Sequence, residues 1–180
     1  MAAPRHIHVV GASASGTTTL GRALATRLGA RHLDTDDFYW MATDPPYTTP
    51  RPVPERLERL TAAMDEAAHG WALSGSLMGW GEPMIPRFDL VVFLYVSPEI
   101  RFERLLRRER GRYGDQIEPG GRMHDQHLEF VEWARGYDRE DFKGRSLKRH
   151  RAWLANMSCP VLELDGARPI AESLAAVLAT

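Results

Sequence analysis

The sequence is poor in lysine and cysteine, and it has no hydrophobic run long enough to cross a membrane. Lys143 and Lys148 are its two lysines, so arginine provides 21 of the 23 basic side chains in 180 residues. The single Cys159 excludes an internal disulfide and suits a reducing compartment. Residues 90–96 form an apolar run much shorter than the roughly 20 residues of a membrane helix, and residues 1–6 lack a signal peptide's hydrophobic region. We therefore expect a cytoplasmic protein.

An excess of charge of one sign is also missing. The chain has 23 Lys and Arg against 24 Asp and Glu, a formal net charge of −1, with 43% apolar residues. The charge balance argues against a general nucleic-acid or membrane-surface binder, although basic residues gather between Arg101 and Arg112. No internal repeat or low-complexity tract is present. Length and composition predict one globular domain over residues 1–180.

A glycine-rich segment follows the first apolar stretch. Residues 7–10 predict a short buried strand, and an amphipathic run from Leu20 to Leu28 predicts a helix that ends at Gly29. Between them lies the G-x4-G spacing of a phosphate-binding loop, or P-loop, in which backbone amides and a helix N-terminus surround an anion. The expected nucleotide-binding residues are Gly11, Ala12, Ser13, Ala14, Ser15, Gly16, Thr17, Thr18 and Thr19.

Thr17 occupies the position at which this motif carries lysine, whereas Thr18 retains the hydroxyl that binds Mg²⁺. The alternative is a strand–turn–helix corner whose glycines only permit a tight turn. The spacing, the preceding strand and the hydroxyls favour phosphate binding. Loss of one donor aimed at transition-state charge typically costs about 3–4 kcal/mol, and arginine is the cation available to offset it.

Three carboxylates follow the second predicted strand, residues 31–34. Asp34, Asp36 and Asp37 come at a strand's carboxyl end, where open α/β sheets bind their ligands. They would hold Mg²⁺ through water or accept a proton from an acceptor hydroxyl; the alternative is a helix N-cap with an acidic first turn. We expect function above all of Asp34 and Asp36.

Five prolines in residues 44–54 predict a loop long enough to be functional. A helix is predicted from Glu55 to about His69, and its Arg56 and Arg59 are expected on a solvated surface, with substrate contact as the alternative. Any of four arginines in this half of the chain would serve an acceptor phosphate at uncertain range: Arg51, Arg56, Arg59 and Arg87.

The remaining pattern is typical of an α/β protein. Strands are predicted at 71–76, 90–96 and 160–166, with helices from Ser97, over 125–138, 140–157 and 169–179. The segment 77–88 is expected to be irregular, and its Trp80 to form either a pocket wall or a core plug.

The helix after Ser97 is strongly basic and leads into a glycine-rich segment, 111–121, that we do not expect to stay helical. A basic helix face is usually only solvated, but here it favours a lid near residues 108–122 that closes on phosphates. Arg104, Arg108 and Arg112 are the leading candidates. In the last long predicted helix, Arg145, Arg149 and Arg151 are further arginines that would reach a nucleotide.

Taken together, GASASGTTTLGRALA, DTDD, RFERLLRRERGR and the terminal strand and helix make the chain resemble the P-loop small-molecule kinases related to nucleoside-monophosphate kinases. The resemblance implies a three-layer fold with a five-stranded parallel sheet in order 2-3-1-4-5 and helices on both faces. It implies that residues 11–19 hold ATP, that Thr18 and Asp34 bind Mg²⁺, and that a mobile region binds a small-molecule acceptor. Archaeal cytidylate kinases share GTTT at the loop, and shikimate-type kinases share the D-x-D of Asp34 and Asp36, in which the second carboxylate engages the acceptor hydroxyl.

These observations favour an ATP-dependent kinase whose acceptor is a nucleotide or nucleoside slightly ahead of a polyol or shikimate-like alcohol. Catalysis would use Asp36, Arg104, Arg108 and Arg112. Thr17 motivates a second hypothesis, a nucleotide-binding regulatory protein with little turnover. A third, a kinase of nucleic-acid ends that uses the Arg101–Arg112 face, is disfavoured by the near-neutral charge.

Overall fold

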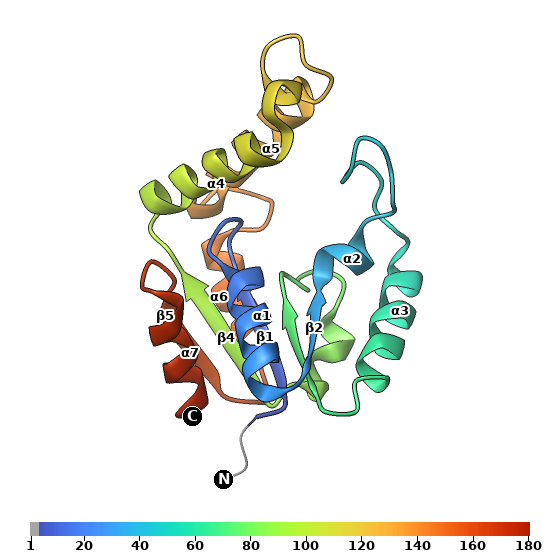
Figure 1. The fold of residues 1–180 in the computed structure, drawn as a ribbon, viewed down its shortest axis with the longest axis vertical. Coiled ribbons are helices and arrows are strands. Elements are labelled where there is room, and N and C mark those ends of the chain that lie inside the picture. Colours follow the sequence, from blue (N-terminus) through green and yellow to red (C-terminus); the bar gives the residue numbers. More distant parts are fainter. Residues whose placement is uncertain (1–3) are drawn as a thin grey trace.

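A computed structural model describes residues 4–180, so the first three residues of the expected domain lie outside the described part. A five-stranded, all-parallel sheet forms the middle layer (Figure 1). The strands are β1 (His6–Gly11), β2 (Arg31–Asp34), β3 (Trp71–Ser74), β4 (Leu90–Tyr95) and β5 (Val161–Asp165). Their order, β2-β3-β1-β4-β5, is the predicted one.

Helices connect the strands and cover both faces of the sheet. The α-helices are α1 (Thr17–Leu28), α2 (Thr35–Tyr39), α3 (Val53–Asp65), α4 (Pro98–Tyr113), α5 (His124–Arg135), α6 (Leu147–Leu154) and α7 (Ile170–Leu178). Short 3-10 helices span Glu82–Arg87, Gly114–Ile117 and Gly136–Asp138. No helix within residues 4–180 is long and apolar enough to cross a bilayer.

Successive side chains of β1 point to opposite faces of the sheet, and the core therefore has two layers. Ile7 and Val9 pack with α1 and α7 on one face, where Leu20 and Leu24 are fully buried. Side chains of α3 and α6 pack on the other face with Val10 and the other β-strand residues that point that way. Because successive side chains of a strand point to opposite faces, two helical layers bury the central strand completely.

The predicted end of α1 and the predicted start of α4 are found. Gly29 ends α1 in the left-handed conformation, with φ 63°. Helix α4 starts at Pro98, directly after Ser97, and Ser97 makes no side-chain capping hydrogen bond.

Two predictions for helices of the second half were wrong, and Trp80 takes the second of its two predicted roles, a core plug. Helix α4 continues through Gly111 to Tyr113, and a 3-10 turn follows, because Leu105 and Ile117 are buried where α4 and this turn pack with α5. Residues 140–146 are not helical, so α6 is only Leu147–Leu154. Trp80 is buried in the core at 5% exposure, where its Nε1 donates to the Ser76 carbonyl.

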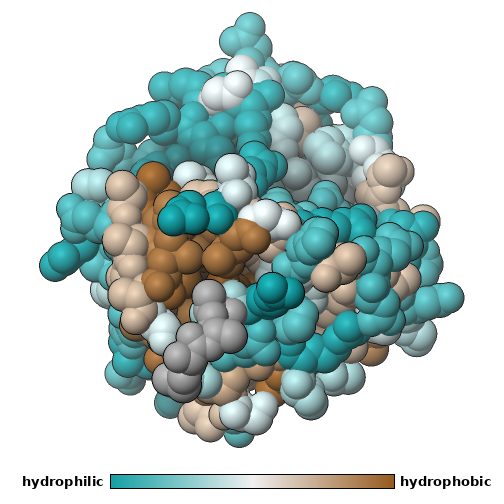
Figure 2. All heavy atoms as spheres, turned by 60° about the horizontal axis from the view of Figure 1, so that its bottom comes forward, coloured by the Kyte–Doolittle hydropathy of each residue, from teal (hydrophilic) through white to brown (hydrophobic). Residues whose placement is uncertain are grey.

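The carboxyl ends of the strands point toward the end of the molecule from which two arms extend, at the top of Figure 1. One arm is α4 and α5, and the other is α2 with the proline-rich loop that leads to α3. Figure 2 turns the opposite end of the molecule forward. Hydrophilic side chains cover most of that face, and an apolar area gathers to one side of it. The candidate site described next lies at the other end, where the strands end and the two arms begin.

Candidate functional site

The loop between β1 and α1 leaves a row of backbone amides unpaired. Ser15 N donates to the Ala12 carbonyl at 3.1 Å, and Leu20 N donates to the Gly16 carbonyl at 3.0 Å. Within residues 4–180, no hydrogen-bond acceptor is recorded for the amides of residues 13, 14 and 16–19. Left-handed backbone at Ala14 (φ 66°) and Gly16 (φ 97°) creates the turn. Unpaired amides at a helix N-terminus in such a turn form an anion-binding concavity.

Two glycines allow the backbone to pack closely around this loop. A Cβ on Gly11 would lie 2.4 Å from Ser15 Oγ and 2.6 Å from the Leu94 carbonyl oxygen, which is closer than any real Cβ contact. A Cβ on Gly166, in the turn after β5, would lie 2.8 Å from the Ser15 carbonyl oxygen. Both glycines are therefore needed for the observed shape of the loop.

Asp34 links the loop to the neighbouring strands. Its Oδ2 accepts hydrogen bonds from Thr18 Oγ1 at 3.0 Å and from Ser74 Oγ at 3.1 Å, and its Oδ1 accepts from Asp36 N at 3.2 Å. The last contact is the N-cap that sequence reasoning offered as the alternative role, so this carboxylate caps α2 and also contacts the P-loop hydroxyl.

These oxygens fit a magnesium ion that is shared with phosphates. Mg²⁺ is usually held by one or two carboxylates together with substrate phosphates and water, not by a protein cage. Within residues 4–180, no cluster of three or more His, Cys, Asp or Glu that would hold a metal is present. Thr18 and Asp34 are adjacent hard oxygen donors beside the unpaired amides, the arrangement that such a shared ion needs.

Asp36 is exposed at its surface but is partly desolvated and lies near other charged groups. Desolvation raises its pKa above the ordinary value, and the charge of Asp34 adds to this effect, whereas Arg145 and Arg108 oppose it. The pKa of Asp37 is raised in the same sense, chiefly by desolvation and then by Asp34. The structure thus brings Asp36, which was predicted as catalytic, into the electrostatic range of Arg108 of α4 and of Arg145, which precedes α6.

Arg145 contacts the P-loop directly. Its Nη2 donates to Ser13 Oγ at 3.1 Å, and its guanidinium lies 4.9 Å from the centre of the Trp133 ring. Sequence reasoning left open which of three arginines reaches this region. The structure places Arg149 on the carbonyls of residues 143 and 144, and Arg151 in an exposed ion pair with Glu163, so only Arg145 contacts the loop.

The three arginines predicted for the lid have different surroundings. Arg104 donates to the Gly166 carbonyl at 2.7 Å, beside the P-loop. Arg108 is half-buried, pairs with Glu109 and belongs to the charges that act on Asp36. Arg112 is exposed, with no hydrogen bond or ion pair recorded in the described chain. Arg101 is not part of the basic face, since it is buried and pairs with Asp138.

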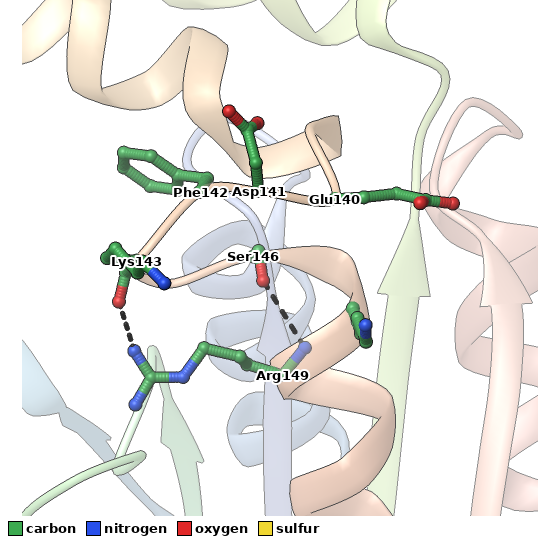
Figure 3. A pocket seen from close by; sticks show the side chains of 7 residues that line it. Glu140, Asp141, Phe142, Lys143, Ser146 and Arg149 are labelled. Atoms are coloured by element: carbon green, nitrogen blue, oxygen red, sulfur yellow. Dashed lines mark hydrogen bonds between the residues drawn. The ribbon is translucent and has the colours of Figure 1, made fainter.

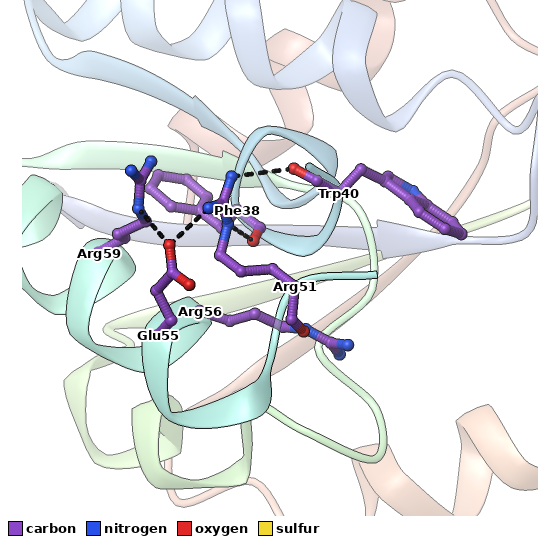
Figure 4. Close-up of polar contacts among 6 residues, drawn as sticks. All are labelled: Phe38, Trp40, Arg51, Glu55, Arg56 and Arg59. Atoms are coloured by element: carbon purple, nitrogen blue, oxygen red, sulfur yellow. Dashed lines mark hydrogen bonds and ion pairs between the residues drawn. The ribbon is translucent and has the colours of Figure 1, made fainter. Parts of the chain in front are cut away.

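Three of the four candidate arginines on the acceptor side form ion pairs with a carboxylate. Arg51 donates to the carbonyls of Phe38 and Trp40 and forms an ion pair with Glu55 at 2.6 Å, which holds the proline-rich loop against α2 (Figure 4). Arg59 also pairs with Glu55, and Arg87 pairs with Asp65. The fourth, Arg56, is 7% exposed, so the prediction of a solvated position was wrong for it.

Arg56 lies against aromatic rings. Its guanidinium is 3.8 Å from the centre of the Tyr39 ring and 5.7 Å from that of Trp80, and its Nε donates to the Arg51 carbonyl at 2.5 Å. Its two terminal nitrogens have no recorded acceptor within residues 4–180, and Figure 4 shows them turned away from Glu55. A nearly buried cation without a carboxylate partner is a candidate ligand for an anion.

The two arms touch each other. Arg122 Nη1 lies 2.8 Å from Asp44 Oδ1, and Gln126 Nε2 donates to the Pro46 carbonyl at 2.9 Å. The segment between α4 and α5 is therefore bridged to the proline-rich loop of the opposite arm.

A parallel sheet in this order, with a glycine loop after its central strand and arginines on both arms, defines the P-loop small-molecule kinase class. A family model described as an AAA domain matches residues 7–127, two thirds of the chain, so the chain belongs to that family of P-loop proteins. It is 44% identical over 161 residues to the uncharacterized protein YqaC of Bacillus subtilis (strain 168), a match that covers 89% of this chain and 88% of that one. It is also 26% identical over 113 residues to the cytidylate kinase of Archaeoglobus fulgidus, covering 57% and 61% of the two chains.

Solved structures show the same fold. A shikimate kinase from Bacteroides thetaiotaomicron superposes with a TM-score of 0.55 at 16% identity over 97% of both chains. A gluconokinase from Sinorhizobium meliloti 1021 superposes with a TM-score of 0.51 at 17% identity over 98% of this chain and 90% of that one. These likenesses establish the fold.

Proposed function

We propose that the chain is an ATP-dependent kinase that transfers the γ-phosphoryl group to a small acceptor, and that residues 1–180 act as one unit with an acceptor-side loop near 44–54 and a lid near 108–122. The observation that carries the proposal is the set of amides at residues 13, 14 and 16–19 with no recorded acceptor, beside the Thr18–Asp34 pair. A tightly packed turn at a helix N-terminus that keeps these donors free suits a polyphosphate better than a structural role does.

Each predicted site residue has a part in this proposal. Residues 11–19 hold the triphosphate, Thr18 and Asp34 hold Mg²⁺, and Asp36 orients the acceptor. Arg104, Arg108 and Arg112 close on the phosphates from α4 and stabilise the charge that develops during transfer. When bound, the magnesium ion would neutralise phosphate charge.

The surroundings of Arg56 favour an acceptor that carries its own anionic group. Its free terminal nitrogens face the acceptor side between Tyr39 and Trp80, a setting that suits a phosphate or carboxylate next to a flat ring. The relationship to a cytidylate kinase agrees with a nucleotide acceptor. We therefore place a nucleotide or nucleoside ahead of a polyol or shikimate-like alcohol.

The test is a product assay with Mg²⁺·ATP and a panel of nucleoside monophosphates, nucleosides, polyols and shikimate-like alcohols. We expect a phosphorylated product from an anionic acceptor, and we expect Arg56→Met to raise its KM about tenfold to a hundredfold while ATP affinity stays unchanged. Arg59→Met is the matched control, because Arg59 is an exposed residue of the same helix that pairs only with Glu55. An equal KM in the two variants would contradict the role of Arg56.

Thr17 supports a second candidate, a nucleotide-binding regulatory protein with little turnover. Calorimetric titration with ATP and Mg²⁺ beside the product assay distinguishes the two. Tight ATP binding with no product from any acceptor would establish the regulator and refute the kinase.

A further inference from the structure

The P-loop of this chain has no lysine, and neither of the chain's two lysines replaces it. Lys143 and Lys148 are both exposed and line a shallow cavity of about 280 Å³ at the start of α6. Figure 3 shows this cavity, whose lining also includes Glu140, Asp141 and Arg149. No contact between a lysine and the loop is recorded in the described chain. A cation at the loop must come from elsewhere.

Arg145 is between those lysines in the sequence, but it contacts the P-loop. Its Nη2 donates to Ser13 Oγ at 3.1 Å, and Ser13 belongs to the part of the loop whose amides are unpaired. Trp133 of α5 packs 4.9 Å from the guanidinium centre, and the Phe142 ring packs against Trp133 in turn at 6.5 Å. Two aromatic side chains and a loop hydroxyl therefore fix the position of this cation.

The charge of Arg145 has no ion-pair partner within residues 4–180, and its buried Nε has no hydrogen-bond partner there. Burial lowers its pKa, and the carboxylate that most strongly opposes this effect is Asp36. An arginine in this setting normally has a carboxylate in contact, because an uncompensated buried charge is costly. Arg145 instead contacts Ser13 on the donor side, and Asp36 on the acceptor side is the carboxylate whose charge acts on it most strongly.

We propose that Arg145 supplies the positive charge that the P-loop lacks at Thr17, and that its guanidinium binds the γ-phosphoryl group as it passes to the acceptor. The inference rests on the proposed kinase function. In that reaction the bond from the γ-phosphorus to the bridging oxygen breaks, its electron pair leaves with ADP, and a bond to the acceptor oxygen forms. For a hydroxyl acceptor, the proton passes to Asp36.

Moving the charge back to the loop tests this inference. Arg145→Met removes the charge but keeps a long side chain over Trp133, and we expect kcat to fall about 10²- to 10³-fold. In the Arg145→Met variant, Thr17→Lys should raise kcat at least tenfold, whereas in the wild-type chain Thr17→Lys should change kcat far less. Arg151→Met is the control, since Arg151 is exposed on α6 and pairs with Glu163. Additive effects of the two substitutions would overturn the inference.

Nucleotide binding gives a readout that does not depend on turnover. A guanidinium on the γ-phosphoryl group discriminates ATP from ADP, so Arg145→Met should weaken ATP binding about tenfold to a hundredfold in calorimetry and ADP binding much less. Equal losses for both nucleotides, or a change confined to acceptor KM, would overturn the assignment. If the wild type binds ATP without forming product, the kinase function fails, and the ATP–ADP difference still decides the role of Arg145. If Arg145→Met does not fold, the same comparison is made with Arg145→Lys, for which we expect smaller losses in the same sense.

Discussion

His8, in the middle of the central strand, makes folding stability depend on pH. Its ring is 0% exposed, lies between the rings of Phe88 and Trp153, and uses Nδ1 to donate to the Leu73 carbonyl at 3.2 Å. Its Nε2 has no partner within residues 4–180. Protonation would therefore bury a charge, and burial lowers the pKa of His8 from 6.5 to about 4.

The direction of this pH dependence follows from the pKa of His8 in the folded chain and in the unfolded chain. Because the folded pKa lies below the unfolded one, the unfolded chain binds more protons between about pH 4 and pH 6.5. The contribution to stability is complete above pH 6.5 and is lost as the pH falls toward 4. Each factor of ten in proton affinity is worth about 1.4 kcal/mol, so the whole contribution is about 3 kcal/mol, of which about 2 kcal/mol is lost at pH 5.

His150 acts in the same direction. It is buried, accepts or donates hydrogen bonds at both ring nitrogens with Tyr137 Oη and Ser76 Oγ, and has a pKa lowered to about 3 by burial first and then by the charge of Arg145. The wild-type free energy of unfolding should therefore fall steeply between pH 7 and pH 5, with contributions from both histidines.

Urea unfolding at pH 8 and pH 5 isolates the contribution of His8. His8→Asn keeps a donor near the Nδ1 position but does not titrate, so its loss of stability between the two pH values should be smaller than that of the wild type by about 2 kcal/mol. His69→Asn, at an exposed position, should behave as the wild type does. The reasoning fails if His8→Asn and the wild type lose the same free energy.

Two further predictions concern the site. Gly11→Ala should abolish ATP binding in calorimetry, because the new Cβ would collide with Ser15 Oγ and the Leu94 carbonyl. Gly111→Ala is the control: its Cβ would meet nothing within 4 Å, so it should keep ATP binding and stabilise α4 by up to about 1 kcal/mol. Normal ATP binding by Gly11→Ala would contradict the packing argument. Asp36→Asn should reduce phosphorylation of an alcohol about 10²- to 10⁴-fold but that of a nucleotide only slightly, since a phosphate acceptor is already ionised. Because the pKa of Asp36 is raised, the wild-type rate with an alcohol should fall with decreasing pH, and the midpoint of this fall should lie above the pKa of an ordinary aspartate. Equal activity of Asp36→Asn in both assays would refute the role of Asp36.

The hydrophobic pattern predicted the strands, and the glycine spacing predicted the P-loop. Ile7 and Val9 alternate with side chains of the other face, and the apolar run of β4 requires helices on both sides, whereas the strand order came from the family resemblance. The surroundings of the arginines were not predictable in this way. Arg101 is buried because Asp138, 37 residues later, pairs with it.

The surroundings of Arg56 and Arg145 depend on residues that are far away in the sequence. Arg56 has the spacing of a solvated helix position, but Tyr39 from another helix covers it. Arg145 was one of three arginines expected to reach a nucleotide, but within a long helix over 140–157; its loop conformation depends on packing that includes Phe142 against Gly136 and Gly144. A charged side chain is expected to be exposed unless its distant neighbours are known, so the sequence predicted the wrong environment for Arg56 and the wrong local structure for Arg145.

The bridge from Arg122 and Gln126 to the proline-rich loop has a mechanical consequence. An ion pair this exposed, at 55% and 75% for its two side chains, contributes about 1 kcal/mol or less, and a neutral hydrogen bond about as much. The bridge is therefore weak enough to break by thermal motion alone. While the bridge is intact the two arms move as one unit, so a fluorophore on either arm would report on the position of both.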